Sequence, residues 1–523
     1  MKTNENNILE RDVWLGESII WKQLNEFYKN KGISAWDNMV PYQVTSNPSI
    51  ADSYVEMILA FLEDWISQKG KITGTCNIVE MGAGHGTFSL MMLRALELYQ
   101  KDFKALDIDV NYIITDVAEA NVEAWKKDTL LSEYINSGET QAVIFDCMQQ
   151  KESWIAEKQM ESGDAPWIFI ANYLLDTLPQ EVFLFEKETI LRAKAIVSQR
   201  TEASDNDPDK WNLELEFKPF CLEDLEISTK GLLNEYQKQG LQRCVLLPAG
   251  AIRCIENLRN ISRDRFLLLS SDKALSTQNS IDNSQPEEIA SFISLSMFVN
   301  FHALMLYFQH EGGIGWIQKT QQDFLASAAF LIGMDITQMR RTEHAFSRCL
   351  DKNSPGDIYS LANLLLKQRF NMSLGCMISL LKLMEWDSVV FAALYDSIIN
   401  CLPYASKNEI SDLINILPLI AARRCNLTSS PDTLFQIAYI LQCMCRYPSA
   451  IELYSIRMQE RDENAEILYN LGLCYYAMDQ LELAKASFLQ AVKLNADMLL
   501  AQGWLYRMNA VEEYWQESEN GSE

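Results

Sequence analysis

The residues whose spacing could perform chemistry begin with a glycine-rich stretch. Glu80-Met-Gly82-Ala83-Gly84-His-Gly86 follows a short β-prone run and precedes a segment with helical periodicity. Glycine suits such a loop because the backbone must turn sharply and a ligand can approach it without interference from a Cβ atom. A dinucleotide-binding loop would read G-x-G-x-x-G, whereas this loop reads G-x-G-x-G with an acid two positions earlier. The pattern predicts a ligand site that differs from the dinucleotide type.

Two acidic residues follow the next β-prone runs along the chain. Tyr112–Thr115 ends at Asp116, and Ala142–Phe145 ends at Asp146. Open α/β sheets bind ligands at the carboxyl ends of their strands, where the Asp116 carboxylate can accept both hydroxyls of a ribose. Either acid alone could equally cap a helix. Because the glycine loop and both acids occur in the right order, a shared ligand site is the better interpretation.

The loop and the acids resemble the motifs of class I S-adenosylmethionine-dependent methyltransferases. The resemblance implies S-adenosyl-L-methionine as the cofactor, with the glycine loop under its methionine part and Asp146 at its adenine amino group. Thr45, upstream of the loop, is expected to help close the pocket. The residues expected to bind the cofactor are Glu80, Gly82, Ala83, Gly84, Gly86, Asp116, Asp146 and Thr45.

Two further segments resemble the MidA-like methyltransferases, a family that includes the mitochondrial complex I assembly factor that methylates a protein arginine. Val44–Pro48 is similar to the family's T-S-P-E stretch, and Ala171–Pro179 is similar to its A-N-E-x-x-D-A-L-P segment. The resemblance covers roughly residues 40–335. Tyr173 stands where the family has glutamate, and Asn47 interrupts the T-S-P-E stretch, so arginine specificity is not carried over to this chain.

The same segment supplies the candidate catalytic residues. Asn172 can hold a nucleophilic nitrogen through its amide, and Asp176 lies in the same loop, although Asp176 could instead cap a turn before Pro179. The sequence Asn172-Tyr-Leu-Leu differs from the N-P-P-Y arrangement of amino methyltransferases. Methyl transfer depends mainly on positioning the nucleophile and excluding water, so a strong general base is optional.

The alternation of β-prone runs with helix-length segments sets the expected fold. It predicts an α/β domain over residues 1–335, a Rossmann-like, mostly parallel sheet with helices on both faces. Residues 1–70 are expected to form a helical cap, and period-two alternation predicts an inserted hairpin at about 180–200. An all-helical connector is expected over 336–430, followed over 431–523 by helical repeats and an acidic tail.

The last ninety residues contain an internal repeat. Ala450 and Ala484 lie in the similar contexts PSAIELY and ELAKASF. Leu471, Gly472 and Tyr475 then precede Ala484 and, further on, Phe488 and Ala491, a spacing that resembles the tetratricopeptide repeat. Two such units are fewer than the three usually needed for stability. Either the preceding helices are degenerate repeats, or the stack leans on the catalytic domain.

Composition narrows the classes of partner. The net charge is −26 and no Lys/Arg cluster offsets it, which argues against nucleic acid as the main substrate. The 12 cysteines lack zinc-ligand spacing, and no metal is expected. No apolar run reaches the roughly 20 residues of a membrane span. The chain is expected to be cytoplasmic, with export signalled by the acidic tail Glu512–Glu519 as the alternative.

These observations leave three functions open. The first is a methyltransferase that modifies a protein side chain and recruits its target or a partner peptide through the repeats. The second is a catalytically degenerate methyltransferase fold that serves as a scaffold, although the intact glycines and both acids argue against it. The third is a methyltransferase acting on a small molecule or a lipid, since nothing in the sequence identifies the acceptor atom.

Overall fold

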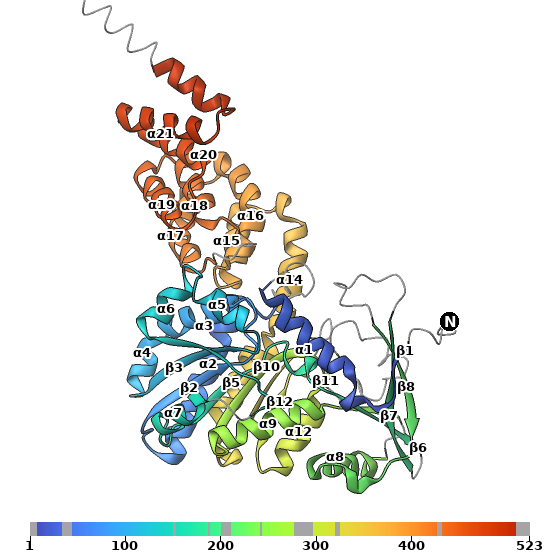
Figure 1. Cartoon of the computed structure of the whole chain (residues 1–523). Coiled ribbons are helices and arrows are strands. Elements are labelled where there is room, and N and C mark those ends of the chain that lie inside the picture. The colour runs from blue at the N-terminus through green and yellow to red at the C-terminus, as the bar shows by residue number, and fades with distance from the viewer. Residues whose placement is uncertain are drawn as a thin grey trace, which may run out of the picture. The chain divides into compact units, whose positions relative to one another are not determined.

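A computed structural model describes residues 8–33, 44–149, 153–186, 189–199, 211–240, 243–276, 297–319, 325–425 and 431–508. The chain forms two compact units, Met1–Leu361 and Ala362–Glu523. Each unit is described by itself (Figure 1).

The first unit is built on an eight-stranded sheet. Five strands run parallel in the order β4, β3, β2, β5, β10, and two further strands continue the sheet beyond β10 in the order β13, β12, with β13 antiparallel to both of its neighbours. The two-residue strand β11 pairs with β10. Their bounds are β2 (Thr75–Glu80), β3 (Asp109–Asp116), β4 (Thr140–Ile144), β5 (Trp167–Ile170), β10 (Phe266–Leu275), β11 (Val299–Asn300), β12 (Ile314–Ile317) and β13 (Leu325–Ile332). The central strands are largely apolar because the sheet is buried on both faces.

Helices cover both faces of this sheet (Figure 1). On one face, α2 packs against α3, α13 and β10, while on the other face α12 packs against β10, β12 and β13, and α7 packs against α9. The helices of this layered core are α2 (Pro48–Lys69), α3 (Thr87–Leu98), α7 (Ser153–Glu161), α9 (Ala249–Ser262), α12 (Phe301–His310) and α13 (Arg340–Phe346). Shorter helices join the strands: α4 (Gln100–Ala105), α5 (Glu119–Trp125) and α6 (Leu131–Ser137). The expected α/β architecture is confirmed.

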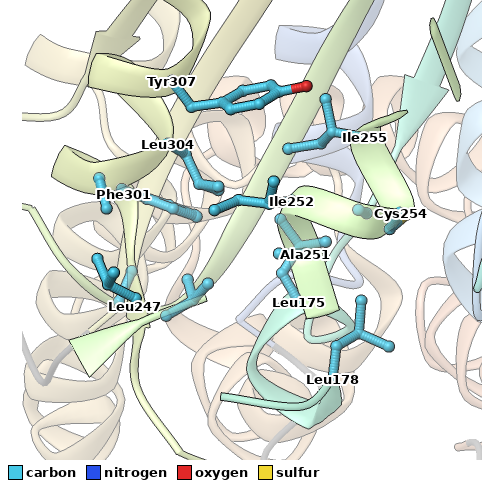
Figure 2. Packing of buried hydrophobic residues seen from close by; sticks show 14 of the residues in the cluster. Leu175, Leu178, Leu247, Ala251, Ile252, Cys254, Ile255, Phe301, Leu304 and Tyr307 are labelled. Atoms are coloured by element: carbon cyan, nitrogen blue, oxygen red, sulfur yellow. The ribbon is translucent and has the colours of Figure 1, made fainter. Parts of the chain in front are cut away.

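One hydrophobic cluster joins the sheet to the loop that follows β5. Leu175 and Leu178 of that loop pack with Ala251 and Ile252 of α9, next to Phe301 and its neighbours on α12 (Figure 2). Leu175 and Ile252 are almost completely buried. The loop is therefore fixed by core packing and cannot move independently of α9.

An insertion between β5 and β10 forms a second sheet, of antiparallel strands. The expected hairpin at about 180–200 is present as β6 (Glu181–Glu186) and β7 (Thr189–Gln199), but the sheet also includes β8 (Trp211–Lys218), β9 (Cys244–Leu247) and the N-terminal β1 (Ile8–Trp14). Helix α8 (Ile227–Lys238) lies between β8 and β9 in sequence. The insertion is thus much larger than the sequence predicted.

The expectation of a helical cap over residues 1–70 is wrong at its start. Ile8–Trp14 is a strand because it pairs with β7, along residues of β7 that do not pair with β6. Its own sequence, ILERDVW, does not encode this contact. Helices follow: the 3-10 turn η2 (Leu15–Glu17), α1 (Ile19–Lys31) and α2. Glu181 of β6 forms a buried ion pair with Arg192 of β7, and the Arg192 guanidinium lies 4.7 Å from the ring centroid of Trp14. These contacts tie β1 to the inserted sheet.

The first unit extends beyond the boundary expected near residue 335. Helix α13 and the π-helical turn η7 (Ser347–Lys352) pack against α2. The buried Asp64 carboxylate on α2 accepts hydrogen bonds from the Thr342 backbone N–H and hydroxyl, both at 2.9 Å, and pairs with Arg341. These contacts hold the segment to the first unit, so the division between the units falls within α14 (Pro355–Lys367) at Leu361.

The described part of the second unit contains helices and no strands. The helices after α14 are α15 (Leu374–Leu383), α16 (Ser388–Cys401), α17 (Lys407–Ala422), α18 (Thr433–Cys443), α19 (Tyr447–Glu460), α20 (Ala465–Ala477) and α21 (Leu481–Leu494). The helix pairs α18–α19 and α20–α21 lie where the two repeats are expected, and α18 also contacts both α16 and α17. A Cβ atom on Gly472 would lie 2.5 Å from the Phe488 ring, which explains why glycine stands where these helices cross. The stack therefore continues into the preceding helices.

Candidate functional site

The candidate site lies at the carboxyl ends of the central strands. Strand β2 has β3 on one side and β5 on the other, so successive connections leave it in opposite directions. Open α/β sheets bind ligands at such a switch point. The register pairs Glu80 with Ile114 and Asp116 with Ile144, which places the predicted acids along this edge.

The glycine loop has the backbone that its sequence predicts. Gly82, Gly84 and Gly86 have φ values of 67°, 56° and 82°, in the left-handed region that side chains disfavour. The Ala83 N–H donates to the Thr115 carbonyl at 2.9 Å, which ties the loop to β3. A Cβ atom on Gly82 would lie 3.2 Å from Leu174, so the glycine brings the loop close to the segment after β5.

Glu80 supports the loop from below and does not line the cavity. Its carboxylate accepts hydrogen bonds from the Ser89 hydroxyl at 2.5 Å and the Tyr112 hydroxyl at 2.7 Å. Burial raises the pKa of Glu80 to about 7, although both hydroxyls favour the charged form. Its predicted role in binding the cofactor is therefore indirect.

Asp116 and Asp146 open onto one cavity of about 400 Å³, together with Gly82. Asp116 accepts hydrogen bonds from the Gly84 N–H at 2.9 Å and the Ala118 N–H at 2.8 Å, while burial raises its pKa. Asp146 accepts from the Met148 N–H at 3.0 Å and the Gln149 amide at 2.9 Å. A carboxylate can accept more than two hydrogen bonds, so both can still take a ligand hydroxyl or amino group. The volume lies in the usual range for small-molecule sites.

Helix α1 forms one wall of the cavity, which the sequence did not indicate. Trp21, Leu24, Asn25 and Tyr28 line it from this helix. Glu10 of β1 holds the start of α1, because its carboxylate accepts hydrogen bonds from the Ser18 hydroxyl at 2.6 Å and the Ile19 N–H at 2.8 Å. The only sequence signal was the start of a helix after a serine cap.

Thr45 is not among the cavity-lining residues, although it is buried just before α2. Asn47, which interrupts the family's T-S-P-E pattern, caps α2 by accepting a hydrogen bond from the Ile50 N–H at 3.2 Å. This segment therefore starts a helix. The structure gives Thr45 no direct position in the pocket.

The segment after β5 closes the other end of the cavity. Tyr173, Leu174, Thr177, Leu178 and Pro179 line it. Tyr173 has φ of 48°, an uncommon conformation for a bulky residue, and its N–H donates to the Ser271 carbonyl at 3.1 Å. Strained backbone of this kind is concentrated at functional sites.

The candidate catalytic residues lie in this segment, just outside the residues that line the cavity. The Asn172 Oδ1 accepts hydrogen bonds from the Tyr54 hydroxyl at 2.8 Å and the Ser271 N–H at 3.0 Å. Its Nδ2 is buried and has no hydrogen-bond partner among the described residues. Because the oxygen already accepts two bonds, Asn172 offers a ligand its N–H groups and not the oxygen that would hold a nucleophilic nitrogen.

Asp176 lies in the 3-10 turn η4 (Leu175–Thr177) and is buried, as is a second carboxyl, Asp272 on β10. Asp272 accepts a hydrogen bond from the Leu175 N–H at 2.9 Å. No motif indicated Asp272, since it is separated from this turn by nearly a hundred residues. Asp176 and Asp272 interact with each other, and both interact with Tyr28 of α1. Side chains of α1, η4 and β10 therefore meet next to the cavity.

Two other features, a metal site and a membrane-spanning helix, are absent from the described residues. No three or more His, Cys, Asp or Glu side chains are grouped to hold a metal ion in the described ranges. None of the described helices combines the length and the hydropathy needed to cross a membrane. The expected acidic export tail at Glu512–Glu519 lies outside the described residues.

Comparison with sequence families gives two matches. Residues 57–278 match a family described as "Putative S-adenosyl-L-methionine-dependent methyltransferase". Residues 465–498 match the tetratricopeptide repeat. The first match covers the glycine loop, both acids and the segment after β5. The second covers α20 and α21.

Several solved structures are similar to the chain. Two are from Burkholderia thailandensis: an uncharacterised protein (12% identity, TM-score 0.36) and a protein bound to S-adenosyl-homocysteine (11% identity, TM-score 0.35). Each similarity covers 63% of this chain and 95% of the other. The plantazolicin methyltransferase BpumL, in complex with the same product, is 9% identical over 61% of this chain and 100% of its own, with a TM-score of 0.28.

The family match and the cavity agree. The cavity carries carboxylates at the two strand ends where a nucleoside would bind, and an apolar middle that includes Met81, Phe145 and Leu174. These residues fit S-adenosyl-L-methionine. The first unit therefore carries a methyltransferase domain that uses S-adenosyl-L-methionine, and the second unit carries a tetratricopeptide repeat at residues 465–498.

Proposed function

We propose that this enzyme methylates a side chain of another protein and that its repeats recruit that protein. The observation that carries this proposal is the segment Asn172–Pro179, which lines the cavity next to the glycine loop, where Leu174 lies close to Gly82, and which also holds two polar groups just outside the lining. Those groups are the Asn172 amide and the Asp176 carboxyl. They provide a donor and a proton acceptor for a polar methyl acceptor.

The cofactor, when bound, supplies an electrophilic methyl group on a sulfonium. The chain's own residues orient it: Asp116 accepts from ribose hydroxyls, Asp146 accepts from the adenine amino group, and the glycine loop passes close to the methionine part. Trp21 and Leu24 of α1 cover the cavity and exclude water. This division leaves the end near Tyr173 for the acceptor.

Asn172 is proposed to position the acceptor through its N–H groups. Tyr54 and Ser271 fix the orientation of the amide by occupying its oxygen. The free donor then faces an oxygen of the incoming group, such as a peptide carbonyl. Leaving such a buried donor without a partner costs stability, which a bound acceptor would restore.

The repeats favour a protein as the partner. In the second unit α18 contacts both α16 and α20, and α19 packs against both α18 and α20. Tyr395 on α16 and Tyr439 on α18 are partly exposed, with ring centroids 6.4 Å apart. Stacked helical repeats offer extended surfaces of this kind to peptides or helices.

Incubation of cell lysate with the enzyme and tritiated S-adenosyl-L-methionine tests the proposal. We expect label in the protein fraction, and less of it when α18–α21 are disturbed by Gly472→Val, which places a side chain against Phe488. Label confined to lipids or small molecules would reject a protein acceptor. Absence of any transfer, together with cofactor binding, would favour a scaffold.

A further inference from the structure

A carboxyl group on a central strand needs an explanation. Asp272 lies on β10 between β5 and β13 and is fully buried. Removing a carboxyl from water is costly unless hydrogen bonds or opposite charges compensate it. Asp272 forms no ion pair with lysine or arginine within the part of the chain that the structure describes. Its compensation must come from hydrogen bonds.

Those hydrogen bonds are directed at the acceptor segment. The Asp272 Oδ2 atom accepts from the Leu175 N–H at 2.9 Å and is 3.4 Å from the Asp176 nitrogen. Its Oδ1 atom accepts from the Lys273 N–H at 2.8 Å. Asp272 thus holds the first turn of η4, which carries Asp176. The hydrophobic anchors of the same turn, Leu175 and Leu178, are packed against α9 (Figure 2).

The carboxyl groups of Asp272 and Asp176 are close enough to interact. Burial, followed by the charge of Asp176 and a hydrogen bond between the two side chains, raises the pKa of Asp272 well above its usual range. Two adjacent buried carboxyl groups cannot both ionise readily, so such a pair holds one proton over a wide range of pH. One proton donated from one carboxyl to the other satisfies both groups.

Three tyrosines among the described residues face the pair. Tyr28 from α1, Tyr54 from α2 and Tyr173 from the acceptor segment all sense the charge of Asp272, and burial raises the pKa of each. All three therefore remain neutral phenols at physiological pH. The Lys273 ammonium lies over the Phe298 ring, 5.1 Å from its centroid. Tyr28 and Tyr173 also line the cavity, which connects the pair to the ligand site.

We propose that Asp272 is a positioning residue that holds Asp176 at the acceptor end of the cavity and shares one proton with it, so that the pair receives the proton released by an acceptor nitrogen. In that step the nitrogen forms its bond to the methyl carbon. The electrons of the carbon–sulfur bond pass to sulfur, and the N–H proton passes to the ionised carboxylate. This inference rests on the proposed function and specifies how its acceptor is deprotonated.

The test compares three substitutions of buried aspartates. In Asp272→Asn the remaining oxygen can still accept from the Leu175 N–H and the amide can donate to Asp176, while the hydrogen bond from the Lys273 N–H is given up; the turn is kept but the shared proton is lost. Asp272→Ala removes both. Asp64→Asn is the matched control, because Asp64 is equally buried and also accepts a backbone N–H, but on α2 against α13.

Two measurements follow on the full-length variants. The first is the pH profile of tritium transfer to lysate protein at limiting acceptor. Because an amide N–H is a weaker donor to the Asp176 anion than the carboxyl O–H that it replaces, the acidic limb should move to higher pH by about one unit in Asp272→Asn. The second is the infrared difference between each variant and wild type at neutral pH, in which the protonated Glu80 carboxyl cancels; the band of one protonated carboxyl should be lost in Asp272→Asn and kept in Asp64→Asn. Binding of S-adenosyl-homocysteine should change less than about threefold in Asp272→Asn, because the turn is kept.

An unshifted profile together with a persisting carboxyl band in Asp272→Asn would overturn the inference. A shift in Asp64→Asn of the same size would also overturn it, since the effect would then be general. If the wild-type enzyme labels no protein, the proposed function fails, and the infrared band alone still decides whether the pair shares a proton.

Discussion

The two ends of the cavity are built in different ways. At the cofactor end, contacts join neighbouring strand ends: the Gly84 N–H and the Asp116 carboxylate are 32 residues apart, as are Glu80 and Tyr112. At the acceptor end, Asn172 is joined to Tyr54, 118 residues away, and to Ser271, 99 residues away. Its turn η4 is held by Asp272 across 97 residues. One end is a local product of strand, loop and helix, whereas the other needs the completed fold.

This difference separates two kinds of function. The cofactor end can be specified by short motifs, since its polar groups follow β2, β3 and β4 directly and only one wall depends on α1. The acceptor end depends on Tyr54 of α2 and on Ser271 and Asp272 of β10, which are far apart in the chain. We infer that cofactor binding and acceptor handling can be changed independently. The predictions below test that independence.

The largest effect is expected at the acceptor end. Asp176→Asn should reduce kcat by about 100- to 10,000-fold, because the proton acceptor is lost. The affinity for S-adenosyl-homocysteine should change by less than about threefold, since Asp176 does not line the cavity. Tritium transfer and isothermal titration measure the two quantities. A parallel loss of both would show that the two ends are not independent.

The converse effect is expected at the cofactor end. Asp116→Asn places an amide donor against either the Gly84 or the Ala118 N–H and removes a charged acceptor for the ribose. The affinity for S-adenosyl-homocysteine should fall roughly 10- to 100-fold, as for the loss of a charge-assisted hydrogen bond. kcat at saturating cofactor should change little. Asp128→Asn, at a carboxylate that also accepts backbone N–H groups, is the control and should bind normally.

A third substitution tests whether the inserted sheet supports the wall formed by α1. Arg192→Met leaves the buried Glu181 carboxylate without its cation, which should reduce the free energy of unfolding by about 3–5 kcal/mol. Glu181 also accepts from the Gly16 backbone, just before α1, so cofactor affinity should fall as well. Denaturant unfolding and titration measure both. The double variant Arg192→Met/Glu181→Met should recover most of the stability, and equal instability of the two would contradict this explanation.

The smallest effect concerns the support beneath the glycine loop. Burial raises the pKa of Glu80 to about 7 from an ordinary value near 4.5, so the folded state keeps a proton that the unfolded chain loses. The contribution of Glu80 to stability therefore falls as pH rises from about 4.5 to about 7 and is constant above that window. The difference in unfolding free energy between wild type and Glu80→Gln should change over this window by at most about 3 kcal/mol. A flat difference would mean that Glu80 is not protonated at neutral pH.

The same contrast explains which features the sequence could predict. Gly82, Asp116 and Asp146 were expected because each follows a strand whose apolar run can be recognised locally. Asp272 could not be found, since its partners lie almost a hundred residues away and its own neighbours, Ser271 and Lys273, form no pattern. Asn172 was recognised as a site residue, but the sequence could not show that Tyr54 and Ser271 occupy its oxygen.

The helices and strands also divide into those encoded by local sequence and those that depend on distant partners. Strands with continuous apolar runs, such as β5, and repeat helices with small residues at fixed spacing, such as α20 and α21, were expected where they occur. Strand β1 differs from the expected helix because its sequence forms a strand only by pairing with β7. The extent of the insertion was missed for the same reason: β8 and β9 complete a sheet whose strands are far apart in the chain.

Calorimetric titration of S-adenosyl-homocysteine into wild type, Gly82→Arg and Gly138→Arg tests the central claim most directly. Both glycines have positive φ, 67° and 83°, but Gly82 lines the cavity beside Leu174 whereas nothing lies within 4 Å of a Cβ atom on Gly138. We predict binding by wild type and Gly138→Arg, and a loss of affinity of roughly 100-fold or more in Gly82→Arg. Equal binding by all three folded proteins, or no binding by wild type, would contradict a cofactor site at the carboxyl ends of β2, β3 and β4.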